Sequence, residues 1–329
     1  MNESPAIEPI EPAQAPPPPV HPYRAFAFRA GLGFAVVAFL LWHFDARPVL
    51  RVLAREKLGH FAATVALYVA SQVMSSYRWS LLAGLLQVRG RYSEFLAYYF
   101  VGTFTNLFVP GLVGGDAARA IYLGRRHDRM GEAVASVIAD RGIGLVALFW
   151  FAAAVAIFLN RSALPPSVIR PTIAVGAVAM LGYLAAPYLV RLTRYAPARL
   201  RAAAEVATPY LLHPQSLIPA IVLSVLLQAS LAVCQWLLAC GLGLETPLSL
   251  FLLCVPIANV FASVPLTLNG LGIRETAYLV LFGMAGVARQ DAIALGLLWF
   301  AATILGGLVG GIAFVRTPMP VLVAAKSKR

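Results

Sequence analysis

Long apolar runs, separated by short polar or basic connections, dominate the pattern of this chain. Most of the runs are close to the roughly 20 residues that a helix needs to cross the hydrocarbon core of a bilayer. The pattern predicts an all-α polytopic membrane protein of about eight transmembrane helices. The apolar segments lie at approximately 24–44, 60–86, 94–113, 131–159, 168–190, 217–241, 249–268 and 291–315.

Three connections are amphipathic and predict helices in the interfacial layer of the membrane. They cover residues 45–59, 117–130 and 191–212. Basic residues concentrate in these three connections, which by the positive-inside rule predicts that all three face the cytoplasm. A segment that enters the membrane and turns back on the same side would change which connections face the cytoplasm.

Both ends of the chain differ from the apolar middle. Residues 1–22 are rich in proline and predict a disordered tail, which we expect to be retained because it lacks the basic start of a signal peptide. The transmembrane domain is expected over residues 23–316. Residues 317–329 predict a short basic C-terminal tail.

The composition agrees with a membrane location. The chain is 60% hydrophobic and 12% charged, whereas soluble domains are about 25% charged. This balance excludes a soluble enzyme. The net charge of +12 is better explained by anionic lipid head groups than by nucleic acid, because no soluble basic module is present. The three cysteines lie in apolar segments and are interpreted as small core residues: Cys234, Cys240 and Cys254.

Two apolar segments are interrupted in comparable ways, over residues 106–119 and 259–278. Each interruption has an asparagine, then a proline, two closely spaced glycines and an acidic and a basic residue. Irregular backbone at membrane depth is tolerated only inside protein or beside a wet cavity. A pair of such breaks, as in a pseudo-repeat of re-entrant segments, is a pointer to the substrate site of a transporter. The alternative is two ordinary helix–turn–helix corners capped by proline and glycine.

Ionisable residues within or beside apolar sequence are costly and are usually paired or functional. Asp116 and Arg119 are three residues apart, on one helical face, and can pair. Asp140 and Arg141 lie inside an apolar run. Arg78, by contrast, is interpreted as snorkelling to an interface.

The predicted head-group site draws on both interruptions and on these charged residues. Arginines would contact phosphate, carboxylates would orient the arginines or respond to protons, asparagines would cap broken helices, and glycines would give access to free N–H groups at half-helix starts. The site comprises Asn106, Gly114, Gly115, Asp116, Arg119, Asp140, Arg141, Asn259, Asn269, Gly270, Gly272, Arg274 and Glu275.

The motifs of several enzyme classes are missing from the sequence. There is no H-E-x-x-H zinc motif, no P-loop and no suggestive Ser-His-Asp spacing. We therefore expect no catalytic residue, no metal and no cofactor, and we exclude an ATP-driven pump.

Four motifs in order resemble a known family. They are Y-R-W at 77–79, N-x-x-x-P-G-x-x-G-G-D-x-x-R at 106–119, S-V-I-A-D-R at 136–141 and P-L-T-L-N-G-L-G-I-R-E at 265–275. Together they resemble the flippase-like family, the lysylphosphatidylglycerol synthase transmembrane-region family, over about residues 24–315. Asn269 stands where relatives often have glycine.

This resemblance implies an all-helical domain related to the part of lysylphosphatidylglycerol synthases that flips aminoacylated lipid. Relatives are associated with hopanoid transport and with polyprenyl- or dolichyl-linked glycan pathways. The synthetase domain of the fused enzymes is not expected here, so aminoacyl transfer is not implied.

The resulting hypothesis is a lipid flippase of the bacterial inner membrane. Its substrate would be an anionic phospholipid, a polyprenyl-phosphate-type (glyco)lipid, an aminoacyl-phospholipid or a hopanoid. Two alternatives remain open: a membrane-embedded lipid-modifying transferase, and a non-catalytic scaffold for a separate synthetase or glycosyltransferase. Expected partners are membrane lipids and such a lipid-synthesising enzyme, without nucleic acid.

Overall fold

The computed structural model describes residues 46–108, 113–159, 164–192, 208–210, 214–262 and 272–318, and these ranges contain helices but no strand. The helices are α2 (Ala46–Leu53), α3 (Leu58–Leu85), α4 (Tyr92–Phe108), α5 (Val113–His127), α6 (Met130–Phe158), α7 (Pro166–Leu192), η2 (Pro214–Leu217), α9 (Ile218–Gly241), α10 (Leu248–Ala262), α11 (Ile273–Met284) and α12 (Arg289–Arg316). The predicted segment 24–44, the tail 1–22 and most of the predicted interfacial helix 191–212 lie outside the described residues.

The all-helical prediction is confirmed for the described part of the chain, where every predicted apolar segment contains a helix. Four stretches are long and apolar enough to cross a membrane, namely α6, residues Pro166–Ala186 of α7, Gln215–Gly241 and α12. The total of eight spans stays a prediction.

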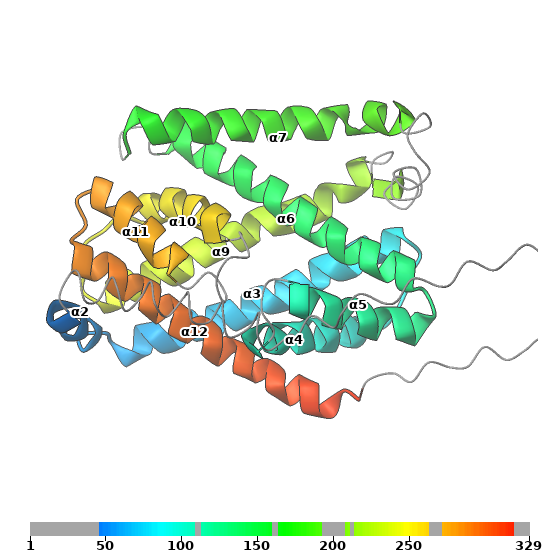
Figure 1. Cartoon of the computed structure of the whole chain (residues 1–329), viewed down its shortest axis with the longest axis horizontal. Coiled ribbons are helices and arrows are strands. Elements are labelled where there is room, and N and C mark those ends of the chain that lie inside the picture. The colour runs from blue at the N-terminus through cyan, green and yellow to red at the C-terminus, as the bar shows by residue number, and fades with distance from the viewer. Residues whose placement is uncertain are drawn as a thin grey trace, which may run out of the picture.

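Long helices run the length of the molecule, as Figure 1 shows for α3, α6, α9 and α12. At 28 residues, α3 is about 42 Å long. Its start lies beside the end of α9, because the N–H of Lys57 donates to the carbonyl oxygen of Gly241. Its other end lies beside the start of α6, because Arg129 donates to the carbonyl oxygen of Gln87.

This geometry bears on the predicted sidedness of the basic connections. The connection around Arg51 lies at one end of α3 and the connection around Arg125 at the other (Figure 1). If α3 crosses the membrane, these two connections lie on opposite sides of it and do not both face the cytoplasm. The predicted scheme treats residues 94–113 as a full span, whereas α4 and α5 form a hairpin that returns to the same end of α3.

The helices α4 and α5 form an antiparallel hairpin. Near its open end, Arg126 pairs with Glu94. Near its tip, Gly102 packs directly against Gly115. The helix α4 ends at Phe108, two positions before Pro110 in the sequence, and proline cannot donate the backbone hydrogen bond that a helix interior needs.

A second antiparallel hairpin consists of α10 and α11. Phe251 at the start of α10 stacks against Phe282 near the end of α11, with ring centroids 4.9 Å apart. This hairpin enters from the opposite end of the molecule (Figure 1). Both tips reach α12, where Gly307 contacts Leu107 of the first hairpin and Gly296 contacts Glu275 of the second. The two breaks are thus brought to the middle of the bundle from opposite directions.

Small residues let α12 approach its neighbours closely, as is common in membrane helix packing. A β-carbon at Gly310 would collide with the carbonyl oxygen of Phe100, and one at Gly306 would collide with the ring of Tyr68. The core helix α12 therefore fixes α3 and α4, and with them the walls of the site described below.

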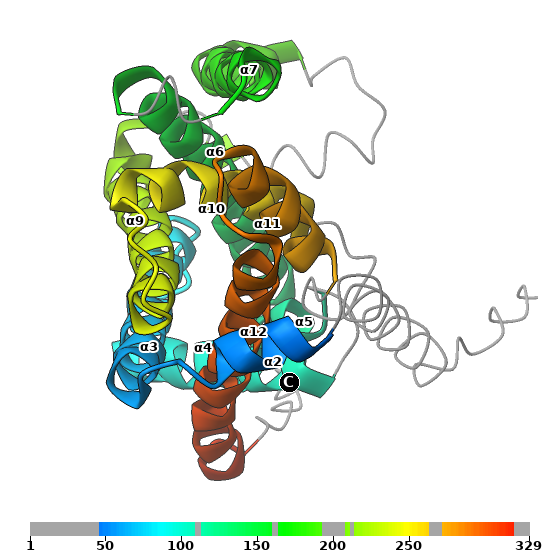
Figure 2. The ribbon, with the colours of Figure 1, turned by 90° about the vertical axis from the view of Figure 1, so that its left-hand side faces the viewer.

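The helix α7 lies at the edge of the bundle, where it packs mainly on α6 (Figure 2). Its apolar side chains face outward, with Val178 68% and Leu181 65% exposed. Such a surface is stable only in contact with hydrocarbon or another protein. The short helix α2 is amphipathic, as predicted: it buries Val49 and Val52 and exposes Arg47 and Arg51.

Candidate functional site

A chain of alternating charges runs through the interior between α3, α5 and α6. In order, its members are Arg78, Asp140, Arg119, Asp116 and Arg141. We call this set the charge ladder. It contains three guanidinium groups and two carboxylates, so one positive charge is in excess.

The inner part of the ladder is centred on Asp140, whose side chain is 1% exposed. One carboxylate oxygen accepts a hydrogen bond from Nε of Arg78 at 2.8 Å and lies 2.8 Å from its Nη2, and the other oxygen accepts from Nη1 of Arg119 at 2.9 Å. Arg78 also donates to the hydroxyl of Ser224 on α9. Buried charges are tolerated when they are paired in this way.

Arg119 is held by aromatic rings as well as by carboxylates. Its guanidinium carbon lies 5.2 Å from the ring centre of Trp79 and 4.9 Å from that of Tyr99. These distances are typical of cation–π contacts. The ring of Trp79 is oriented by its own hydrogen bond to Ser136.

The outer part of the ladder is a two-point pair between Arg141 and Asp116. Nε and Nη2 of Arg141 donate to the two carboxylate oxygens at 2.7 and 3.0 Å. The Asp116 carboxylate also accepts from Arg119, which confirms the predicted pair at i, i+3. The side chain of Arg141 is 43% exposed, in contrast to 4% for Arg119. The ladder therefore leads from the protein interior to an accessible guanidinium group.

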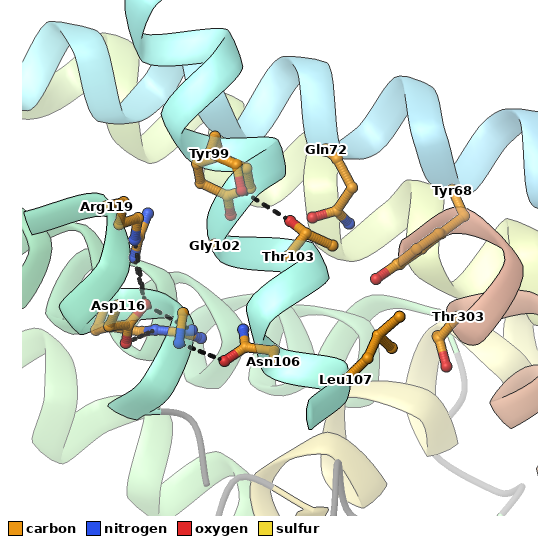
Figure 3. Close-up of a pocket in the computed structure, with 12 residues that line it drawn as sticks. Tyr68, Gln72, Tyr99, Gly102, Thr103, Asn106, Leu107, Asp116, Arg119 and Thr303 are labelled. Atoms are coloured by element: carbon orange, nitrogen blue, oxygen red, sulfur yellow. Dashed lines mark hydrogen bonds and ion pairs between the residues drawn. The ribbon is translucent and has the colours of Figure 1, made fainter. Parts of the chain in front are cut away.

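A polar cavity of about 170 Å³ lies at this outer end, beside the tip of the first hairpin (Figure 3). It is enclosed by residues from α3, α4, α5, α6 and α12. The lining consists of Tyr68, Gln72, Tyr99, Gly102, Thr103, Asn106, Leu107, Gly115, Asp116, Arg119, Arg141 and Thr303.

The start of α5 is capped from across the break. The Oδ1 atom of Asn106 accepts a hydrogen bond from the N–H of Gly115 at 2.8 Å. A β-carbon at Gly115 would collide with Asn106 and with the carbonyl oxygen of Gly102. The structure thus shows the capping geometry that was predicted for Asn106. It places Gly114, Gly115, Asp116 and Arg119 in the first two turns of α5, and the last three of these residues line the cavity.

The second break has a different chemistry. Gly272 has a φ of +85°, a conformation that favours glycine, and its N–H donates to the Oε2 atom of Glu275. This bond is one half of a capping box, because glycine has no side chain that could accept from the N–H of Glu275 in return. The N–H of Gly272, which the sequence predicted to be free for an anion, is therefore engaged within α11.

The remaining predicted residues of this break are only partly described. Arg274 and Glu275 are buried in the first turn of α11, and Asn259 lies in the last turn of α10. Asn269 and Gly270 lie outside the described residues. No described residue of the second break lines the polar cavity, so the predicted head-group site between the two breaks is not brought together as one site in the described residues.

Comparison with known proteins identifies the family of this chain. The family model described as the lysylphosphatidylglycerol synthase TM region matches residues 26–311. The chain belongs to this family. Searches of the curated proteins and of the solved structures found no match. Membership and the apolar helices together indicate a membrane protein with a lipid-related function.

Sequence reasoning missed Arg78, a central member of the charge ladder. The interpretation of Arg78 as an interfacial side chain was wrong, because it is 7% exposed and is bonded to Asp140. The partner lies 62 positions away in sequence, so no local pattern indicates it. The rule that ionisable groups in apolar helices are paired would have included Arg78.

Metal-binding side chains were sought in the ranges that the structure describes. There, no group of three or more His, Cys, Asp or Glu side chains is arranged to hold an ion.

Proposed function

We propose that this protein moves a lipid with an anionic phosphate head group between the leaflets of the bacterial inner membrane. In this proposal the phosphate binds in the polar cavity, in contact with Arg141 and Arg119. The observation that carries the proposal is the excess positive charge of the charge ladder at the wall of that cavity.

The pairing of Arg141 supports an oxyanion ligand. Asp116 occupies two donors of the guanidinium fork with two oxygens of one carboxylate. Phosphate presents oxygens to such a fork in the same way, which is why arginine is favoured for phosphate recognition. Because the side chain of Arg141 is 43% exposed, its guanidinium group remains accessible beside Asp116.

The size of the cavity supports binding of a head group rather than of a whole lipid. Pockets that enclose a drug-sized ligand hold about 300–1,000 Å³, and this cavity holds about 170 Å³. The hydrocarbon chains would stay outside it, in apolar surroundings, while the polar group crosses.

The arrangement of the two hairpins supports transport. Transporters often contain inverted repeats with broken helices that meet near the middle of the membrane. Here two helical hairpins enter from opposite ends, and both tips contact α12. We propose that both hairpins are re-entrant and that alternating exposure of the cavity involves their movement against the long helices.

We also propose that the protein performs no chemistry on the lipid. The carboxylate in the cavity wall, Asp116, accepts hydrogen bonds from Arg119 and Arg141. A carboxylate held by two guanidinium groups is a poor general base, because both partners favour its charged form.

The proposal is tested with purified protein in phosphatidylcholine vesicles that contain a trace of fluorescent phosphatidylglycerol. A membrane-impermeant reductant bleaches the outer leaflet, and continued bleaching reports translocation. We expect Arg141→Ala to slow translocation about tenfold to a hundredfold, the effect of losing hydrogen bonds to a charged group. Arg126→Ala is the control, because Arg126 is 58% exposed and lies at the open end of the first hairpin.

The other possible results of this assay distinguish a flippase from a transferase and from a scaffold. Equal rates for the parent protein, Arg141→Ala and empty vesicles would contradict the proposal. A chemically altered lipid recovered from the vesicles would favour a transferase. Absence of both activities, with retention of a co-purifying synthetase, would favour a scaffold.

A further inference from the structure

A second, larger hollow lies between α7 and the hairpin of α10 and α11. We call it the apolar groove. Its volume is about 570 Å³. Its wall is formed mainly by aliphatic and aromatic side chains, among them Val168, Ile257, Phe261, Ala277, Val280 and Leu281.

The polar groups of this wall are largely engaged within their own helices. The hydroxyl of Thr172 donates to the carbonyl oxygen of Val168, and that of Thr276 donates to the carbonyl oxygen of Gly272. The N–H of Gly272 donates to Glu275. A polar ligand would find few partners here, whereas a hydrocarbon chain would lose nothing by burial.

The groove opens to the outside of the bundle. Phe261 is 54% and Val280 is 47% exposed at its wall. The opposite wall belongs to α7, one of the helices apolar enough to cross a membrane. In a bilayer, a groove that opens beside such a helix would face hydrocarbon, which favours an apolar chain as its occupant.

The helix α12 borders the polar cavity directly and the apolar groove through α11. The first turn of α11, which forms one end of the groove, packs through Glu275 on Gly296 of α12. Thr303 of the same helix lines the polar cavity. Seven residues of α helix correspond to about 10 Å. The first turn of α11 therefore lies between the groove and the stretch of α12 that borders the polar cavity.

From this juxtaposition we infer that the apolar groove binds one acyl chain of the anionic phospholipid whose phosphate binds in the polar cavity. The inference rests on the proposed function and adds the second half of the substrate to it. The two breaks then have separate tasks: the first binds the charged head group beside Arg141, and the second lines the groove that binds the tail.

The test uses the full chain in vesicles with phosphatidylglycerol that carries a photoreactive diazirine in one acyl chain. After illumination, mass spectrometry maps the cross-linked residues. We expect cross-links to Ile257, Ala277 and Val280. Phosphatidylcholine with the same labelled chain should react there several times less, because its head group carries no net negative charge to bind the polar cavity.

Two variants fill the groove. Ala277→Trp and the more exposed Val280→Trp are both expected to lower groove cross-linking about tenfold, through lost burial of the chain, and to slow translocation of phosphatidylglycerol. Val178→Trp is the control, because Val178 is an exposed apolar residue of α7 outside the groove. Having two variants protects the test against a folding defect in either one.

The outcomes separate this inference from the proposed function. Equal labelling by phosphatidylcholine, or normal translocation by a groove-filled variant, would overturn the acyl-chain site while leaving the flippase proposal intact. Competition by polyprenyl phosphate but not by unlabelled phosphatidylglycerol would overturn the choice of an acyl chain. A parent protein that moves no lipid would instead contradict the proposed function.

Discussion

Asp140 connects two arginines that would otherwise be uncompensated charges in the protein interior. Arg78 is 7% and Arg119 3% exposed, and both donate to its carboxylate. Breaking a buried ion pair on one side is far more costly than deleting both partners, because it leaves a charge without compensation. The ladder is therefore stable as a unit and sensitive to the loss of any inner member.

Asp140→Asn is expected to lower the free energy of unfolding by about 3–5 kcal/mol. The measurement is thermal unfolding in mild detergent. Glu132→Gln serves as the control, because its pair with Arg129 is partly exposed and such pairs contribute about 0–1 kcal/mol. Combining Asp140→Asn with Arg78→Gln should cost less than the sum of the single changes. Additive effects would show that the two side chains do not interact.

Glu56 makes stability depend on pH at the corner between α2 and α3. Both of its carboxylate oxygens are buried beside Gly241 without a hydrogen-bond partner, and desolvation raises its pKa to about 7. A raised carboxyl pKa means that the folded protein binds the proton more tightly than the unfolded chain. Stability is therefore lost as the pH rises from the unfolded pKa toward 7.

Glu56→Gln should remove this dependence. The parent protein is expected to unfold at a lower temperature at pH 8 than at pH 5, and the variant to show a smaller difference. The exposed Glu245→Gln, at a corner of the same end of the bundle, is the control and should behave like the parent. An unchanged difference in Glu56→Gln would rule out Glu56 as the group responsible.

Local relations between residues were predictable, and distant ones were not. The Asp116–Arg119 pair and the Asn106 cap follow from spacings of three and nine residues. The spacing of Gly272 and Glu275 is that of a capping box, so the engaged N–H was available to sequence reasoning. The bond between Arg78 and Asp140 depends on how α3 packs against α6, which no local pattern contains.

Among the elements, the first hairpin depends on close contact at its tip. A side chain at Gly115 would push α5 away from Gly102 and displace Asn106, which caps α5. Gly115→Ala is expected to destabilise the protein by about 1–3 kcal/mol, the usual cost of overpacking, and to slow translocation.

The matched control is Gly84→Ala in α3, where no atom lies within 4 Å of an added β-carbon. Because alanine is a better helix former than glycine, this change should be neutral or stabilising by up to about 1 kcal/mol. If both variants unfold at the parent temperature, the contact at the tip does not contribute to stability.

The positions of helices were predictable because apolar length and proline or glycine breaks are local signals. Whether each hairpin returns to its own end was left open by the sequence, which was compatible with re-entrant segments and with full spans, since the run over 94–113 has nearly the length of a full span. Only packing of α5 against α4, through Gly102 and Gly115, shows that the chain turns back.

For the whole molecule, the two hairpins determine which connections share a side of the membrane. Single cysteines at Arg51 and Arg125, in a background without the native cysteines, should react with impermeant reagents from opposite sides. The reason is that these positions lie at opposite ends of the bundle. Labelling of both from one side would mean that α3 does not cross the membrane.

The central claim is that a lipid phosphate binds the accessible arginine of the charge ladder. Solid-state nuclear magnetic resonance tests it most directly, through dipolar coupling between the phosphorus of phosphatidylglycerol and arginine side-chain nitrogens in the reconstituted protein. We predict couplings at hydrogen-bonding range in the parent protein, and we predict that the contribution of Arg141 is lost in Arg141→Lys, which keeps the charge but loses the fork. A coupling that is unchanged in Arg141→Lys, and so arises only from other arginines, would contradict the account.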